Sequence, residues 1–209
     1  MEINKEELKN ETKETVNQVK DSFKNVDINK EAKETKGFVK EMLVAPFEKV
    51  ERIAKGEEDA FKKAMVLLVL NIAAVVIVAL ISVFKYSYGS FGSKIWNLIE
   101  SAISPVLGIA VPAILILIMN KTNKKPLTTI ISTLVVADLP SIVAALIDIV
   151  ETILPRIYLV SSPISSALFA VSTVLTFFGM RTLFGEGKEN FITKFAGIQL
   201  VTALILYIV

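Results

Sequence analysis

The sequence predicts an all-α membrane protein, a polytopic helical bundle of five transmembrane helices with a charged helical N-terminal tail. Two observations carry this prediction. Residues 64–209 consist of long apolar runs joined by short polar links, whereas residues 1–63 hold 15 of the 21 acidic and 14 of the 23 basic residues. A bilayer core about 30 Å thick needs about 20 apolar residues in a helix, so several such runs predict several crossings.

The five predicted spans follow one another closely. The first is the clearest, because Asn71 is the only strongly polar side chain among its 21 residues. The second contains Pro105 and Pro112, which predict a kinked path. The third runs past Asp138 toward Ile153. In chain order, the spans are expected at about 64–84, 100–120, 127–148, 164–181 and 191–209.

The tail, residues 1–37, is predicted to be a partly helical cytoplasmic segment with a thin apolar stripe among Lys and Glu. An internal echo relates residues 11–20 to residues 31–40. One interpretation of these features is a coiled-coil or partner-binding arm. The other is a mostly solvated helix, which is favoured because so thin a stripe buries little surface. We therefore expect residues 1–36 to pack little against the bundle, with residues 1–56 as the region open to a protein partner.

Residues 38–56 differ from the tail, because their broad apolar face is opposed by charged side chains. Such a segment just before a membrane span is typical of an amphipathic helix lying in the plane of the membrane interface. Pro46 predicts a kink or a restart of this helix, and Gly56 predicts its end. The membrane domain then occupies residues 57–209.

Basic residues are distributed unequally between the two predicted sides of the membrane. Nine flank the spans on the side of the tail, and three flank them on the other side. The positive-inside rule then predicts a cytoplasmic N-terminus and an external C-terminus. We expect the membrane to be the bacterial plasma membrane. The nine are Lys55, Lys62, Lys63, Lys121, Lys124, Lys125, Arg181, Lys188 and Lys194, and the three are Lys85, Lys94 and Arg156.

Asp138 is the most informative polar residue at membrane depth. An acidic side chain there costs about 2.5–3.5 kcal/mol on insertion scales, which makes it a functional candidate. It also begins Asp138-Leu139-Pro140, a sequence typical of a helix start with an N-cap oxygen and an early proline. We expect a third span broken near Asp138, with its carboxylate capping the second half. A proton or cation role and a packing ion pair are the alternatives.

Three further polar side chains are candidates for a structural or functional role. Asp148 and Glu151 share a helix face, either as a solvated pair at the outer interface or as two ligands of a hard cation. Asn71 is expected to hydrogen-bond between helices. Close packing of the fourth span is favoured by its small residues, Ser161, Ser162, Ser165, Ser166 and Ala167.

The composition excludes several functional classes. The chain has no cysteine and no histidine, which excludes disulfides, thiolate nucleophiles, Cys- or His-based zinc sites and Ser-His-Asp chemistry. No Gly-x-x-x-x-Gly-Lys-Ser/Thr pattern occurs, and no clustered basic face points to nucleic acid. We therefore expect no enzyme activity, no cofactor and no metal site.

Residues 42–53, Met-Leu-Val-Ala-Pro-Phe-Glu-Lys-Val-Glu-Arg-Ile, followed by the first span, resemble the pre-membrane region of bacterial members of the Yip-type (Ypt-interacting protein) family. Five closely spaced helices and an end just after the last span fit this resemblance, which covers about residues 40–209. Eukaryotic members bind Rab-type GTPases, but their Asp-Leu-Tyr-Gly-Pro and Gly-Tyr-x-x-x-Pro signatures are absent, which argues against GTPase binding. The resemblance implies the fold and a non-enzymatic role in organising membranes or recruiting partners.

Two functional hypotheses follow. The first is a non-enzymatic five-span protein whose tail and interfacial helix engage the bilayer or a partner. The second is a small transporter or transporter subunit with a midplane site near Asp138, because discontinuous helices often build such sites. The surroundings of Asp138 discriminate between them. A helix cap in dry packing favours the first, and a water-accessible cavity favours the second.

Overall fold

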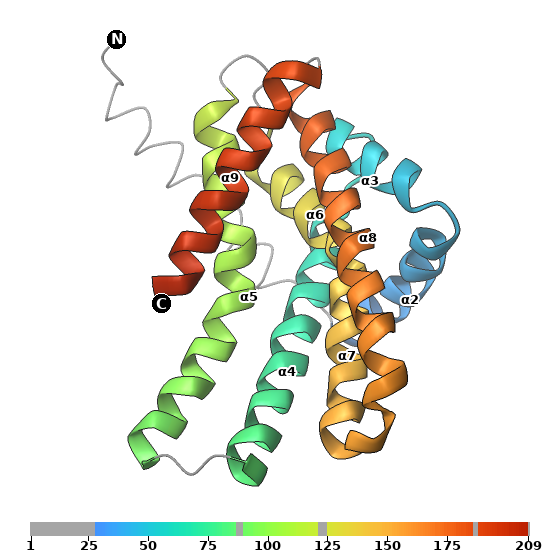
Figure 1. Cartoon of the computed structure of the whole chain (residues 1–209). Helices are drawn as coiled ribbons and strands as arrows, with labels where there is room; N and C mark the ends of the chain where they lie inside the picture. Colours follow the sequence, from blue (N-terminus) through green and yellow to red (C-terminus); the bar gives the residue numbers. More distant parts are fainter. Residues whose placement is uncertain (1–27, 87–89, 121–124, 186–187, 209) are drawn as a thin grey trace.

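The regular structure of this chain is helical in all the residues that its computed structural model describes, which are 28–86, 90–120, 125–185 and 188–208. This confirms the predicted all-α fold (Figure 1). The elements are α2 (Ile28–Val44), α3 (Pro46–Lys55), α4 (Phe61–Tyr86), α5 (Phe91–Met119), α6 (Leu127–Ala137), α7 (Leu139–Ile153), the 3-10 helix η1 (Pro155–Ile157), α8 (Tyr158–Phe184) and α9 (Lys188–Ile208).

Four helices in the described part of the chain are long and apolar enough to cross a membrane: α4, α5, α8 together with η1, and α9. The pair α6–α7, bent by 47°, makes a fifth if it counts as one broken span. Large apolar side chains on all four long helices face outward, and Phe84, Leu159 and Tyr207 are 82%, 85% and 89% exposed. Such a surface is stable only in lipid, so this is an integral membrane protein.

The second span begins earlier than predicted, at Phe91 instead of near residue 100. Ser90 caps this helix, because its hydroxyl accepts a hydrogen bond from the backbone N–H of Ser93 at 3.3 Å. The helix then continues through Pro105 and Pro112 as far as Met119. The apolar residues before the first proline therefore extend the span itself.

Helix α6 lies at the centre of the bundle, where α3, α4, α5 and α8 all pack against it. Most of its residues are buried, including the polar Ser132 and Thr133. Their hydroxyls donate to the backbone carbonyls of Thr128 and Thr129, at 2.7 and 2.8 Å. These polar groups are thus satisfied within the helix, which allows a dry core around it.

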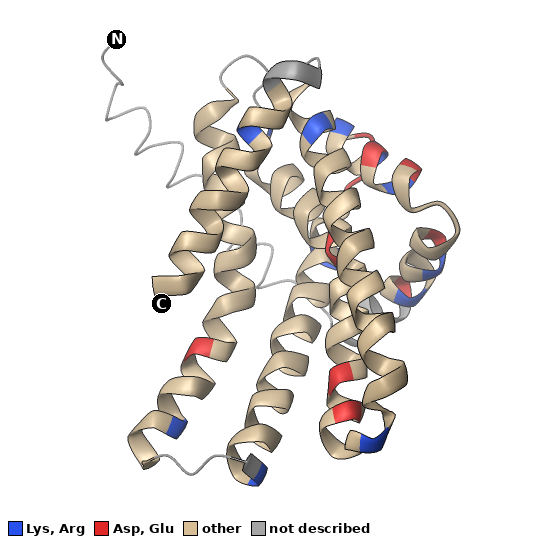
Figure 2. Cartoon of the chain, viewed as in Figure 1, with Lys and Arg blue, Asp and Glu red and all other residues tan. Residues whose placement is uncertain are grey.

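Side-chain bonds to backbone tie the helices together at both ends of the bundle. At one end, the Asn120 side-chain amide donates to the carbonyl of Leu183 at 2.8 Å, and the Lys125 amine donates to the carbonyl of Lys55 at 2.9 Å. At the other end, the Lys85 amine donates to the carbonyl of Thr152 at 3.2 Å. Figure 2 shows Lys and Arg of the long helices near the helix ends, with ribbon that carries no basic residue between them.

Residues 38–56, expected as an amphipathic helix with a kink or a restart at Pro46, belong to two helices that meet at Ala45. Helix α3 starts with Pro46 in its first turn and ends before Gly56, whose φ of 81° lies in the left-handed region. The proline and the glycine thus act as the sequence indicates. Of the predicted tail, residues 28–37 belong to α2, whereas residues 1–27 lie outside the described residues.

The broad apolar face of this segment packs against the other helices. Val50 and Ile53 of α3 are fully buried against α6 and α8, and Phe38 and Met42 of α2 are buried in the same core. The face that the sequence suggested would rest on lipid therefore completes the protein core. In Figure 1, α2 and α3 cover one side of the bundle.

Candidate functional site

Asp138 is the single residue between α6 and α7, so the predicted break in the third span is present. The predicted cap is wrong, because the Asp138 side chain makes no capping bond to the first turn of α7. Its Oδ1 atom accepts a hydrogen bond from the hydroxyl of Ser172 on α8 at 2.7 Å. Pro140, at the second position of the helix, has no N–H to offer, and a neighbouring helix supplies the donor instead.

Asp148 and Glu151 bond to the same neighbouring helix. The hydroxyl of Ser165 donates to Asp148 Oδ1 at 3.2 Å, and the hydroxyl of Ser161 donates to Glu151 Oε2. Both carboxylates are partly buried. The two acids are therefore bound to α8, which the prediction of a solvated pair did not include.

The three serines lie on one face of α8, because they are separated by four and seven residues. All three are buried. Since α7 and α8 are antiparallel neighbours joined through η1, Asp138 before α7 and the two acids within α7 meet these serines in reverse order along the chain. We call the three pairs the acid–serine series: Asp138–Ser172, Asp148–Ser165 and Glu151–Ser161.

The acid–serine series can act in two ways. A hydroxyl donates to a carboxylate and accepts from a carboxylic acid, so each pair can be satisfied with the acid ionised or protonated. The pairs therefore hold α7 to α8, and they also set three ionisable groups along one helix–helix contact of a membrane domain. Figure 2 shows acidic positions spaced along α7.

Asn71, the fourth polar residue singled out in the sequence, lies half-buried on α4 and belongs to none of these pairs. In the ranges that the structure describes, no group of three or more acidic side chains is arranged to hold a metal ion. The structure thus brings Asp138, Asp148 and Glu151 into one helix–helix contact and leaves Asn71 apart.

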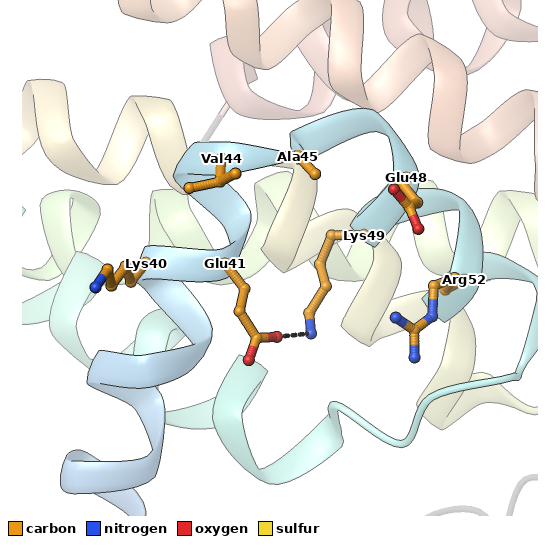
Figure 3. Close-up of a pocket in the computed structure, with 7 residues that line it drawn as sticks. All are labelled: Lys40, Glu41, Val44, Ala45, Glu48, Lys49 and Arg52. Carbon is orange, nitrogen blue, oxygen red and sulfur yellow. Dashed lines mark hydrogen bonds and ion pairs between the residues drawn. The ribbon is translucent and has the colours of Figure 1, made fainter.

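A second candidate site is a groove of about 380 Å³ where α2 meets α3 (Figure 3). It combines basic, acidic and apolar side chains, with charges from both helices. In Figure 3 the Lys49 amine and the Arg52 guanidinium extend into the same region below α3, and Glu48 lies above it. The lining residues are Lys40, Glu41, Val44, Ala45, Glu48, Lys49 and Arg52.

Lys49 is the buried centre of this groove. Its amine forms ion pairs with Glu41 Oε2 and, at 2.7 Å, with Glu58 Oε1, and it lies 4.9 Å from the ring centre of Phe38. Burial alone lowers the pKa of Lys49, but the hydrogen bonds to the two carboxylates outweigh it and raise the pKa above its ordinary value. The hydrogen bond from Lys49 in turn holds the pKa of Glu41 below its ordinary value.

Apolar side chains surround the outer edge of the groove. Leu43 and Val44 are 71% and 79% exposed, and Phe47 is 47% exposed although its ring meets Phe178 of α8 edge-on at 5.5 Å. We call Leu43, Val44 and Phe47 the α2–α3 elbow. It is an apolar surface that directly adjoins a charged groove.

Sequence reasoning missed two parts of these sites. Ser172 was not singled out, although its distance of seven residues from Ser165 continues the small-residue face of α8. Lys49 looked like one of several solvated charges on the polar face of α3, and Glu58 lies in the link to α4, so no local pattern marks their ion pair. Comparison of the chain with protein-family models, curated proteins and solved structures gave no match.

Proposed function

We propose that this chain is a non-enzymatic membrane protein of the Yip type, in which α2 and α3 form a cytoplasmic platform that organises the bilayer surface or recruits a partner through residues 1–56. One observation carries the proposal. The α2–α3 pair is fixed to the membrane bundle by its apolar face, while its outer side presents the elbow beside a charged groove.

The position of the platform is defined by buried contacts. Val50 and Ile53 are fully buried against the bundle, and the Lys125 amine binds the carbonyl that ends α3. Lys49 joins α2, through Glu41, to the link before α4, through Glu58. A segment held in this way moves with the membrane helices, which supports a role as a platform over a role as a free arm.

The elbow supports contact with the bilayer. Exposed Leu43 and Val44 on a soluble surface would be costly, whereas side chains of this kind insert between lipid headgroups when they flank charged residues. The basic residues at the same end of the bundle favour the cytoplasmic side for this platform. We therefore place the N-terminus inside and the C-terminus outside.

Spin labels test the interfacial position, because the chain has no cysteine of its own. One label replaces Val44, and a matched label replaces Glu51 on the polar side of α3. In liposomes, we expect the label at residue 44 to collide mainly with oxygen, which partitions into lipid, and the label at residue 51 with a water-soluble nickel chelate. Equal access of the chelate to both labels contradicts the proposal.

A second candidate function is favoured by the acid–serine series. Three carboxyl groups, at the start of α7 and within it, are each bonded to a hydroxyl of α8. Acidic side chains inside a membrane domain are typical of proton pathways in transporters. Proteoliposomes with an internal pH dye and an imposed potential test it. Asp138→Asn should abolish a proton flux, and Glu100→Gln, which alters an acid of α5 outside the series, should leave it unchanged. Absence of flux in the unmodified protein rules this candidate out.

A further inference from the structure

The charges of the α2–α3 groove are arranged for a ligand that carries both signs. Glu48 and Arg52 lie four residues apart on α3, a spacing at which such side chains commonly pair. Within the part of the chain that the structure describes, no ion pair joins these two side chains. Both side chains line the groove, Glu48 with an exposed carboxylate and Arg52 with its guanidinium beside Glu58.

Arg52 retains most of its hydrogen-bonding capacity. Its guanidinium lies 3.8 Å from Glu58 Oε2, and that oxygen has no hydrogen-bond partner among the described residues. A guanidinium has five N–H donors in a planar fork, which matches a phosphate group. The Lys49 amine lies in the same groove, but its ion pairs with Glu41 and Glu58 already balance its charge, so Arg52 is the cation open to an anion.

Glu48 supplies the opposite charge one helical turn away. Its exposed carboxylate lies at the top of the groove in Figure 3, on the same helix as Arg52. A carboxylate in this place repels a purely anionic ligand and attracts an ammonium group. The groove therefore fits a dipolar ligand better than an anion.

The apolar edge of the groove indicates where such a ligand comes from. Val44 lines the groove and is 79% exposed, and Leu43 beside it is 71% exposed. A soluble phosphate compound would gain nothing from these side chains, whereas the acyl chains of a membrane lipid would cover them.

We propose that the α2–α3 groove binds the headgroup of a phospholipid that carries a primary ammonium, with the phosphate on Arg52, the ammonium on Glu48 and the acyl chains along Leu43 and Val44. This inference rests on the proposed position of α2–α3 at the membrane surface. It adds a lipid class and named contacts to that position.

Native mass spectrometry of the full chain in detergent tests the inference with three lipids of equal acyl chains. Phosphatidylethanolamine should be retained several-fold better than phosphatidylcholine, whose methylated ammonium cannot donate to Glu48, and better than phosphatidylglycerol, which has no ammonium. Equal retention of the three lipids overturns the inference. Soluble glycerophosphoethanolamine should bind much more weakly than the lipid, and equal binding would show that the ligand is not a membrane lipid.

Two exposed substitutions separate the phosphate contact from the ammonium contact. Arg52→Gln should lower retention of phosphatidylethanolamine several-fold, and Glu48→Gln should remove its advantage over phosphatidylcholine. The matched controls are Lys55→Gln and Glu51→Gln, which alter a pair on α3 outside the groove. If Arg52→Gln and Lys55→Gln retain phosphatidylethanolamine equally well, the proposed lipid site is refuted. The lipid site can fail this test while the spin labels still place the elbow in lipid. In that case the proposed function stands without the lipid site.

Discussion

Gly179 of α8 lies directly against Val50 of α3. A β-carbon placed on Gly179 would lie 2.9 Å from Val50 Cγ1 and 2.8 Å from Cγ2 of Thr133 on α6. Both neighbours are fully buried. The missing side chain at residue 179 is thus what allows α3, α6 and α8 to meet, and it fixes the platform to the membrane bundle.

Gly179→Ala should destabilise the protein, although alanine is the better helix former. Val50 and Thr133 are β-branched and have few alternative rotamers, so the helices themselves must move. Overpacking of this kind costs about 1–3 kcal/mol, against about 1 kcal/mol gained in helix propensity. Thermal unfolding in detergent measures the net loss. Gly197→Ala on α9, where a β-carbon has open space, should cause no loss, and equal effects of the two substitutions would contradict the packing described.

The membrane helices were predictable from the sequence because length and apolar composition alone define a span. The break at Asp138 was predictable too, since Asp138-Leu139-Pro140 disrupts a helix locally. The docking of α3 was not. An amphipathic helix has the same pattern whether its apolar face meets lipid or other helices, and the deciding feature, Gly179, lies far away in the sequence.

The candidate site was also predictable only in part. The sequence singled out Asp138, Asp148 and Glu151, because acids are costly at membrane depth. Their partners on α8 depend on how two helices are registered, which no local pattern encodes. The partner predicted for Asp138 was wrong for this reason. The local sequence favours a backbone cap, whereas the contact with α8 provides the hydroxyl of Ser172.

A double-mutant cycle should detect the bond between Asp138 and Ser172. Coupling energies of interhelical hydrogen bonds in membranes average about 0.6 kcal/mol and reach about 1.7 kcal/mol, so Asp138→Asn and Ser172→Ala should couple by an energy within this range. Unfolding in denaturing detergent gives the four stabilities. Thr173→Ala, which removes an exposed hydroxyl bonded within α8, should not couple to Asp138→Asn. Strict additivity for Ser172→Ala would argue against the interhelical bond.

Single cysteines test the predicted topology. Lys125 and Arg156 lie at opposite ends of the α6–α7 pair, so a single broken span places them on opposite faces of the membrane. We expect an impermeant thiol reagent, added to intact cells, to label a cysteine at residue 156 and to reach one at residue 125 only after lysis. Labelling of both from one face would show that α6–α7 is a re-entrant loop.

Acidification should loosen α2 from the bundle. The bond to Lys49 lowers the pKa of Glu41, so its stabilising contribution is complete above the ordinary carboxylate pKa and disappears as pH falls through the lowered value. The pKa of Lys49 is raised, so its contribution persists below its ordinary value and is lost only as pH rises through the raised one. We therefore expect no change between pH 7 and about pH 10, and loosening below about pH 4.

Distances between spin labels at Lys36 on α2 and Val69 on α4 would measure this change, since both residues are exposed. In Glu41→Gln the distance distribution should already be broader at pH 7 and should respond less to acid, because the ionisable partner of Lys49 on α2 is gone. Glu51→Gln removes an acid of α3 that pairs with Lys55 instead, so it should keep the acid response of the unmodified chain. If Glu41→Gln and Glu51→Gln respond alike, the Glu41–Lys49 pair does not hold α2 in place.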